Sequence, residues 1–157
     1  MVWSSVGAFC GIMAVVWTNG WILHDTDLVM VVGSFGASAV LVYGAVKSPM
    51  SQPRNLVGGH VVSAIIGVTA YQLLHSHIWL AAPIAVAVAI GAMQLTRTLH
   101  PPGGATALIA VIGSQQIHEL GYQYVLLPVG LGASVMLVIA LLWNNIPPDR
   151  RYPESWR

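Results

Sequence analysis

One short motif in the second half of the chain constrains the fold more than any other. HPPGGATA, at residues 100–107, places two prolines and two glycines next to each other inside an apolar region. Proline is tolerated in the first turn of a helix, where its missing N–H would have no partner. We therefore expect a helix over about 102–113, roughly 18 Å long at 1.5 Å per residue. The hydrocarbon core of a membrane is about 30 Å thick, so this helix alone is too short to cross it.

The start of this short helix suggests a binding function. A helix that begins inside a membrane turns its unpaired N–H groups and the positive end of its dipole toward its surroundings. Unwound chain before it, here over 98–101, is tolerated at membrane depth only where protein or a water-filled cavity surrounds it. We expect Pro101 and Pro102 to shape the break, and an anion to occupy the cavity.

Composition supports a membrane setting. The chain has 157 residues, of which 56% are hydrophobic and 7% charged, and its mean hydropathy is +0.73. Soluble domains carry about 25% charged residues. These values predict an all-α integral membrane protein whose main partner is the lipid bilayer. A net charge of +1 gives no reason to expect nucleic acid binding. No nucleophile, acid–base pair or phosphate-binding loop is recognisable, so we expect neither an enzyme nor a cofactor.

Six apolar segments can be marked in the sequence, at about residues 3–23, 28–46, 56–74, 79–96, 99–114 and 122–143. If all six cross the membrane, every Lys and Arg falls on the face that carries the N-terminus, whereas Asp25, Asp27 and Glu119 fall on the other face. The positive-inside rule then predicts that both termini are cytoplasmic. Residues 1–146 would form one transmembrane domain and 147–157 a cytoplasmic tail. Four crossings with segments two and five re-entrant remain the alternative. The basic residues are Lys47, Arg54, Arg97, Arg150, Arg151 and Arg157.

The two halves of the chain resemble each other. Residues 36–41 match 104–109 at an offset of 68, and 57–58 match 129–130 at an offset of 72. With three segments in each half, about 1–76 and 77–146, such a repeat is inverted, as in many transporters. We then expect segments two and five to be broken half-helices, interrupted at 33–36 and 100–104, with their N-termini meeting near the bilayer midplane. Coincidence among small and apolar residues is the alternative.

Three blocks of the sequence resemble those of the HPP family of integral membrane proteins. They are GSFGASAVL at 33–41, SQPRNLVGGH at 51–60 and HPPGGATA at 100–107. The family occurs in bacteria and plant plastids, is usually described with four crossings, and has members linked to nitrite transport. The resemblance therefore implies a bacterial inner-membrane protein that carries a small inorganic anion, nitrite above all, as a channel or a secondary transporter.

The predicted anion site gathers the hydrogen-bond donors of the two interruptions and the basic side chains near them. Hydroxyl and free N–H groups suit an anion, an imidazole can donate a hydrogen bond or carry a proton, and a long Arg side chain can reach into a vestibule. Small residues and histidines also suit close helix packing, and this alternative stays open. The predicted substrate-binding residues are Ser34, Gly36, Ser38, His60, Arg97, His100, Gly103, Gly104 and Thr106.

Two other functions remain open. A metal or cation permease could use a group of polar residues on the non-cytoplasmic face, although no pair has the spacing of a known metal motif and we assign no metal ligand. A non-transporting scaffold would need the breaks only for compact packing. A homo-oligomer is a further prediction, with the row Gly59, Ser63 and Gly67 as a candidate contact. The residues of the rival metal group are His24, Asp25, Asp27, His75, His77, His118 and Glu119.

Overall fold

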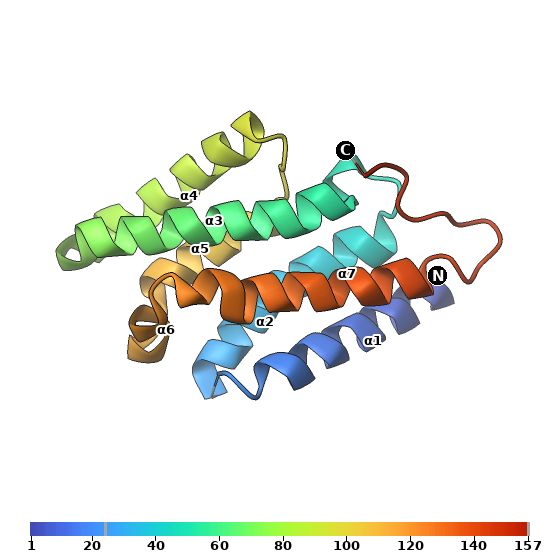
Figure 1. The fold of residues 1–157 in the computed structure, drawn as a ribbon, viewed down its shortest axis with the longest axis horizontal. Coiled ribbons are helices and arrows are strands. Elements are labelled where there is room, and N and C mark those ends of the chain that lie inside the picture. Colours follow the sequence, from blue (N-terminus) through green and yellow to red (C-terminus); the bar gives the residue numbers. More distant parts are fainter. Residues whose placement is uncertain (24, 157) are drawn as a thin grey trace.

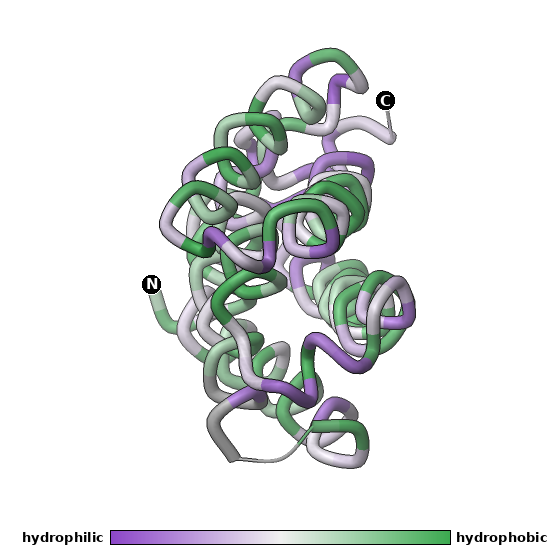
Figure 2. Tube along the Cα trace, turned by 90° about the vertical axis from the view of Figure 1, so that its left-hand side faces the viewer, coloured by the Kyte–Doolittle hydropathy of each residue, from purple (hydrophilic) through white to green (hydrophobic). Residues whose placement is uncertain are grey.

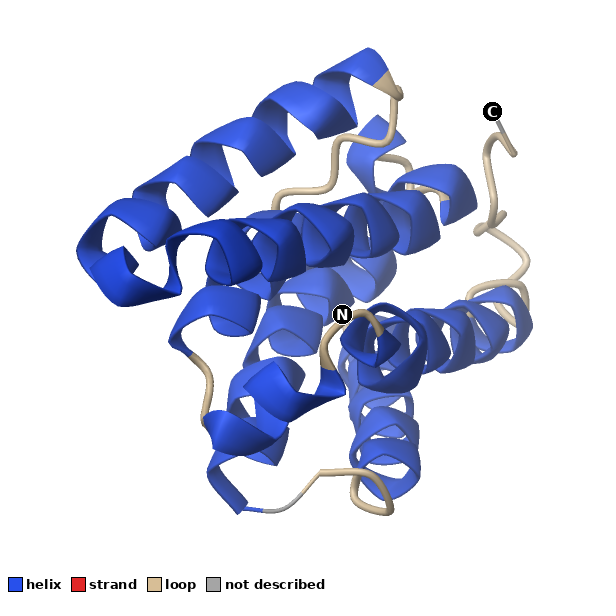
Figure 3. Cartoon of the chain, turned by 60° about the vertical axis from the view of Figure 1, so that its left-hand side comes forward, coloured by secondary structure: helices blue, strands red, loops and turns tan. Residues whose placement is uncertain are grey.

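The computed structural model describes residues 1–23 and 25–156, without the side chains of residues 25, 26, 28 and 29. Within this part of the chain the secondary structure is helical and contains no strand (Figure 3). Two π-helical segments, η1 and η4, and two 3₁₀ turns, η2 and η3, adjoin the α-helices. The bounds are α1 Val2–Asn19, α2 Asp25–Ala39, η1 Val40–Gly44, η2 Pro49–Ser51, α3 Pro53–Leu74, η3 His75–His77, α4 Ile78–Leu95, α5 Pro102–Ile112, α6 Gln115–Leu120, η4 Val125–Gly130 and α7 Leu131–Trp143.

Each of the six predicted apolar segments overlaps a helix, and the short helix α6 lies between the last two segments. Three stretches of the described chain are long and apolar enough to span a membrane: Val2–Asn19, Pro53–Leu95 and Val125–Trp143. The second stretch comprises α3, η3 and α4, which fold back on each other as a hairpin (Figure 1). The all-helical membrane architecture is thus confirmed. The number of crossings and the inverted repeat stay predictions.

The long helices run back and forth between two ends of the molecule (Figure 1). Both termini and the connections over 45–52 and 96–101 lie at one end, which we call the basic end. The turn over 75–77 and the segment over 113–124 lie at the other, which we call the histidine end because it carries His75, His77 and His118. Arg157 lies outside the described residues. The described basic residues of the basic end are Lys47, Arg54, Arg97, Arg150 and Arg151.

The fifth segment forms the short helix that the prolines predict. Helix α5 begins at Pro102, with Pro101 as its N-cap residue, and ends at Ile112. The chain before it, over 98–100, is extended loop. Proline has no N–H to donate, so the first turn of α5 loses no hydrogen bond by starting there.

The second segment is not broken where we expected. Helix α2 runs without interruption through Gly33, Ser34 and Gly36, and the regular helix changes to the π-helical η1 only at Val40. A glycine inside a helix costs only about 1 kcal/mol relative to alanine and removes no backbone hydrogen bond. The hydroxyl of Ser34 also donates to Val31 O within the same helix. The prediction of a half-helix at 33–36 is therefore wrong.

Helices pack closely because small residues face their neighbours. A Cβ at Gly67 of α3 would lie 2.5 Å from Ala107 O of α5, so only glycine allows this approach. Hydrophobic residues run along the helices and hydrophilic ones gather near their ends (Figure 2). Helix α3 packs against both α4 and α5, while α1 packs against α2 and α7. Helix α2 touches α5, which joins the two groups.

The tail after α7 folds back onto the basic end. The side chain of Tyr152 is 2% exposed, and its hydroxyl donates to Ser51 O at 2.7 Å. Burial raises the pKa of this hydroxyl above its ordinary value, so Tyr152 stays protonated and remains a donor. Gln52 Oε1 accepts from the backbone N–H of Glu154 at 2.9 Å. The tail is therefore part of the folded structure around η2.

Candidate functional site

Four polar side chains from three helices and one loop meet inside the bundle. Ser38 comes from α2, His60 from α3, His100 from the loop before α5, and Thr106 from α5. Their exposures are 0%, 0%, 0% and 1%. Ser38 Oγ lies 2.8 Å from His60 Nε2 and 2.8 Å from His100 Nε2. His60 Nδ1 lies 2.7 Å from Thr106 Oγ1. We call this set the histidine-pair cluster.

Backbone groups complete the cluster at its edges. His100 Nδ1 lies 2.8 Å from Met50 O in η2, at the basic end. Ser38 Oγ also lies 3.2 Å from Ser34 O. The hydroxyl of Tyr124 donates to Thr106 O at 3.1 Å. Every side-chain nitrogen and hydroxyl of the cluster therefore has a partner, as buried polar groups require.

Glycines let the elements carrying the cluster approach each other. A Cβ on Gly59 would lie 2.5 Å from His100 Cβ and 2.8 Å from Thr98 O. A Cβ on Gly103 would lie 2.7 Å from Ser63 Oγ. The loop is also held by Asn55, whose Nδ2 donates to Leu99 O at 2.8 Å. The row Gly59, Ser63 and Gly67 thus packs within the chain and is not free to join two copies, so a homo-oligomer stays a prediction without it.

The first amides of α5 are not free to bind an anion. Gly103 N donates to His100 O at 2.8 Å, and Gly104 N donates to Pro101 O at 3.0 Å. The chain closes a tight turn before the helix, and this turn satisfies the donors that a helix usually leaves unpaired. The other polar donors of this region are the side chains of the histidine-pair cluster, which are bonded to one another and to Met50 O.

The predicted meeting of two helix N-termini is also wrong. The carboxylate of Asp27, near the start of α2, accepts hydrogen bonds from the hydroxyl and the backbone N–H of Ser114, just after α5. Ser38, near the end of α2, contacts His100, just before α5. The two helices therefore lie antiparallel over their whole length, and their N-termini are at opposite ends of the molecule.

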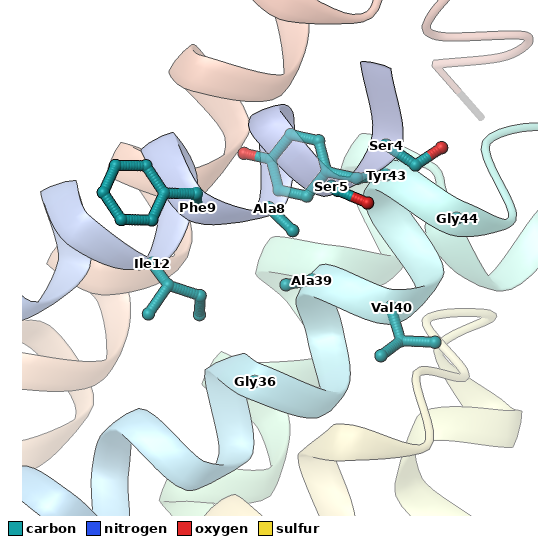
Figure 4. A pocket seen from close by; sticks show the side chains of 10 residues that line it. All are labelled: Ser4, Ser5, Ala8, Phe9, Ile12, Gly36, Ala39, Val40, Tyr43 and Gly44. Atoms are coloured by element: carbon teal, nitrogen blue, oxygen red, sulfur yellow. The ribbon is translucent and has the colours of Figure 1, made fainter. Parts of the chain in front are cut away.

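The structure brings some of the predicted site residues together and separates others. Ser38, His60, His100 and Thr106 form the cluster, and Ser34 lies beside it through its carbonyl. Gly36 faces away from it. That glycine lines a hollow of about 490 Å³ between α1 and the helix formed by α2 and η1, together with apolar residues such as Phe9, Ile12 and Val40 (Figure 4).

The remaining predicted residues have other surroundings. Gly103 is buried against α3 and α4, where it allows close packing. Gly104 is half-buried, and a Cβ there would lie 3.8 Å from Val86 of α4. Arg97 is exposed in the loop after α4. None of these three has a side chain in the cluster, so their predicted direct contact with a solute at the cluster is not supported by the geometry.

Arg97 instead belongs to a hollow at the basic end. This hollow, of about 500 Å³, is lined by Lys47, Pro49, Gln52, Arg54, Asn55, Arg97, Glu154 and Ser155. Three of these residues are cationic and one is anionic. Arg54 Nη2 also donates to Thr96 O at 2.6 Å, which ties the hollow to the loop before α5. We call it the basic vestibule.

Two neighbouring residues join the basic vestibule to the cluster. Pro49 lines the vestibule, and the next residue, Met50, supplies the carbonyl that contacts His100. Asn55 also lines the vestibule, and its amide holds the carbonyl of Leu99, next to His100. His100 is therefore bonded to a residue that directly follows one lining residue of the vestibule, and its chain neighbour Leu99 is bonded to another.

The polar residues at the histidine end have local partners. His75 Nδ1 lies 3.4 Å from Gln72 O, and His118 stacks on Tyr71 with ring centroids 3.6 Å apart. Among the described residues no three His, Cys, Asp or Glu side chains are close enough to share a metal ion. His24 and the side chain of Asp25 lie outside the described residues. The geometry therefore gives the metal-permease alternative no support.

Three contributors to this region had no clear signal in the sequence. Met50 acts through its carbonyl, which no side-chain pattern reveals. Phe35 of α2 lies against His60, with ring centroids 4.7 Å apart. Asn19 of α1 is fully buried near Phe35 and Gly132, and neither its Nδ2 nor its Oδ1 has a hydrogen-bond partner. A polar residue late in an apolar helix is the only sequence signal for Asn19.

Long apolar helices that enclose one buried polar cluster are the architecture of an integral membrane protein. The model of the HPP transmembrane region matches residues 1–153, so the chain belongs to the HPP transmembrane family. Two transmembrane proteins of Dictyostelium discoideum are similar to it, at 41% and 40% identity over 157 residues. Each alignment covers 98% of this chain, but only 50% and 55% of the two relatives, so the chain spans about half their length. No solved structure matches the chain significantly.

Proposed function

We propose that this protein transports a small inorganic anion, nitrite above all, across a membrane through the histidine-pair cluster. The observation that carries the proposal is the burial of two imidazoles and two hydroxyls between α2, α3 and α5. Ionisable residues inside membrane segments are expensive, and where they occur they commonly mark solute pathways or proton relays. The known link of HPP members to nitrite favours this anion over others.

The donors of the cluster suit an oxyanion. Thr106, His60, Ser38 and His100 place hydroxyl and ring nitrogen groups in one continuous chain, in which each polar atom lies 2.7 or 2.8 Å from its partner on the next side chain. A nitrite oxygen that enters between them exchanges its water shell for these donors. The binding is modest, since each donor already has a protein partner, and modest binding lets the site release its solute.

The basic vestibule supports an anionic solute. Lys47, Arg54 and Arg97 surround a hollow that adjoins the backbone bonded to His100. Glu154 offsets one of these three charges, and a cleft whose remaining charge is positive raises the local concentration of anions. An anion thus collects next to the cluster before it enters.

The described arrangement is closed, because the four side chains contact one another directly. We propose that transport requires α2 and α5 to separate. The π-helical segments η1 and η4 are the places where the helices change geometry, one directly after Ser38 and Ala39 and one before α7. Single π turns inside helices occur often at functional sites. In the proposal, η1 and the non-helical kink at Leu127 within η4 serve as hinges.

We also propose six crossings related as an inverted repeat. Ser38 and Thr106 occupy equivalent positions at the offset of 68, and both belong to the cluster. Helix α3 of the first half packs on α4, and α7 of the second half packs on α1, which is the exchange of partners that a two-fold relation produces. The described Lys and Arg residues share one end, so by the positive-inside rule we propose that the basic end is cytoplasmic. The bacterial inner membrane that the family resemblance implies stays part of the proposal.

Uptake into proteoliposomes tests the proposed function. The full chain is reconstituted, and stopped-flow uptake of nitrite, nitrate, formate and chloride is compared with protein-free vesicles. We expect nitrite uptake well above the background, reduced in a Thr106→Val variant that keeps the shape of the side chain but removes its hydroxyl. Thr69→Val is the matched control. It makes the same substitution, but the Thr69 hydroxyl bonds to Ile65 O and to the Tyr122 hydroxyl, outside the cluster. No movement of any anion above empty vesicles contradicts the proposal.

A further inference from the structure

The protons of the histidine-pair cluster can be assigned from its partners. Met50 O can only accept a hydrogen bond, so the proton of a neutral His100 lies on Nδ1, which is 2.8 Å away. The Nε2 atom of His100 then has no proton and accepts one from the hydroxyl of Ser38. The Met50 carbonyl therefore fixes the direction of the hydrogen bonds that His100 makes.

The assignment continues through Ser38 to the other side of the cluster. A hydroxyl has only one proton, and Ser38 gives it to His100, so His60 must donate its Nε2–H to Ser38 Oγ. The Nδ1 atom of a neutral His60 is then unprotonated and accepts from the hydroxyl of Thr106. The two imidazoles therefore hold opposite tautomers, and all hydrogen bonds point from Thr106 to Met50.

Ser38 has a second acceptor within reach, which allows the cluster to hold one more proton. Ser34 O lies 3.2 Å from Ser38 Oγ. When His100 becomes an imidazolium, its Nε2–H donates to Ser38 Oγ, and the Ser38 hydroxyl turns to Ser34 O. No group is left without a partner in either state. A cluster with only a structural role has no need of this alternative.

The surroundings of the pair contain few charges. Helices α4 and α5 contain no Asp, Glu, Lys, Arg or His. Tyr124 donates to Thr106 O, Asp27 of α2 is bonded to Ser114 at the histidine end, and Arg54 of α3 is bonded to Thr96 O at the basic end. Among the described residues, the ionisable group in direct contact with each imidazole is the other imidazole, with ring centroids 5.0 Å apart.

We infer that the chain from Thr106 through His60 and Ser38 to His100 is a proton relay that couples proton movement to the transport proposed above. A water-borne proton binds Thr106 Oγ1 while the hydroxyl proton of Thr106 passes to His60 Nδ1. The Nε2–H of His60 passes to Ser38 Oγ, and the hydroxyl proton of Ser38 passes to His100 Nε2. His100 then releases its Nδ1–H to water in the basic vestibule, so one proton has crossed and every group keeps its proton count.

The relay resets because its reversed state is unfavourable. After one passage the bare Nδ1 of His100 faces Met50 O, and two acceptors repel each other. When α2 and α5 separate during transport, each imidazole gives up its transferred proton to water and takes one back at its original nitrogen, so the proton count is unchanged. The Met50 carbonyl thus sets the resting tautomer of His100, and the proton gradient sets the direction of net movement.

Nitrogen-15 spectra of the histidines test the tautomers without any transport measurement. The full chain, labelled with ¹⁵N-histidine, is placed in lipid bilayers, and the two buried residues are identified by their loss in His60→Gln and His100→Gln. We expect protonated Nδ1 in His100 and protonated Nε2 in His60. The same tautomer in both residues, or two imidazolium rings at neutral pH, overturns the relay. The tautomers are read from the wild-type spectra, and the two variants serve only to assign the signals.

Proton movement in vesicles tests the relay itself. With a pH-sensitive dye inside, nitrite uptake should be accompanied by proton movement, and Ser38→Ala should reduce the latter by roughly a hundredfold, the lower end of what a positioned proton-transfer group contributes. Ser38→Thr keeps a hydroxyl and should restore it. Ser134→Ala is the control, because that exposed hydroxyl donates to the carbonyl of Gly130, the N-cap residue of α7, and does not belong to the cluster.

The outcomes separate the relay from the proposed function. Nitrite uptake without proton movement, or full proton movement in Ser38→Ala, overturns the relay and leaves anion transport standing. A third outcome is proton movement under an imposed pH gradient that is lost in Ser38→Ala, with no movement of any anion. This outcome supports proton transfer through the cluster and contradicts anion transport.

Discussion

The two groups of histidines in this protein occupy different environments. His60 and His100 lie in the bundle with no exposed surface and connect α2, α3 and α5. His75 and His77 form an exposed turn at the histidine end, where His75 contacts a carbonyl of its own segment. Histidine side chains therefore connect three separate elements inside the bundle, whereas at the histidine end they lie in the turn of a single hairpin. Burial together with long-range partners, and not residue type, distinguishes the candidate site.

The largest expected effect comes from deleting one member of the buried pair. His60→Ala leaves a cavity and removes the partners of Ser38 and Thr106, so the free energy of unfolding in detergent should fall by about 3 kcal/mol. His77→Ala, at the exposed turn, should change it by no more than about 0.5 kcal/mol. Equal effects of the two variants would show that the pair has no special structural role.

Close packing around the cluster gives the next prediction. Gly67→Ala places a methyl group against Ala107 O and should destabilise the protein by about 2 kcal/mol. Gly91→Ala of α4, where no atom lies within 4 Å of the new methyl group, should be neutral or stabilise by up to about 1 kcal/mol. Thermal unfolding of both variants checks this, and a stable Gly67→Ala would refute the tight contact between α3 and α5.

Removing one hydroxyl should have a smaller effect on stability. Thr106→Val leaves His60 Nδ1 without its donor, which costs about 1 kcal/mol. Thr69→Val removes a partly exposed hydroxyl at the histidine end, where water replaces it, and should have almost no effect. If urea or detergent unfolding ranks the two threonines in the opposite order, the hydrogen bond between Thr106 and His60 is unimportant for the fold.

Substitutions in the basic vestibule should have the smallest effect, and they should change only the rate of nitrite uptake. Replacing Arg54 and Arg97 together by Gln should slow nitrite uptake severalfold at low ionic strength, whereas the difference should disappear near 1 M salt, where the Debye length is about 3 Å. Arg151→Gln, at an exposed position that does not line the vestibule, is the control. A salt-independent loss would show that the arginines act by structure and not by attraction.

Some of this arrangement follows from the sequence. Two adjacent prolines cannot lie inside a regular helix, so the start of α5 at Pro102 was predictable. The hydroxyl positions Ser38 and Thr106 were also predictable, because they are equivalent in the two similar blocks. The break at 33–36 was not a safe inference, since glycine weakens a helix without removing a hydrogen bond.

The remaining features depend on tertiary packing. The amides of Gly103 and Gly104 were expected to be free, but a turn through the carbonyls of His100 and Pro101 occupies them. The carbonyl of Met50 meets His100 only because the segment between α2 and α3 folds under the loop before α5. The contact between Met50 and His100 joins residues fifty positions apart through the backbone, so no local pattern encodes it, whereas the turn at Gly103 and Gly104 is local and depends on how the loop before α5 is folded.

Accessibility of the cluster to an anion during turnover tests the central claim most directly. In a Cys10→Ser background, Thr106→Cys is treated in bilayers with a small negatively charged thiol reagent, with Asn55→Cys in the basic vestibule as the reference for an open position. We expect slow modification of the cysteine at position 106, slowed further by nitrite, because the solute and the reagent share one path. Complete protection of position 106 while position 55 reacts, with or without nitrite, would mean that no anion reaches the histidine pair.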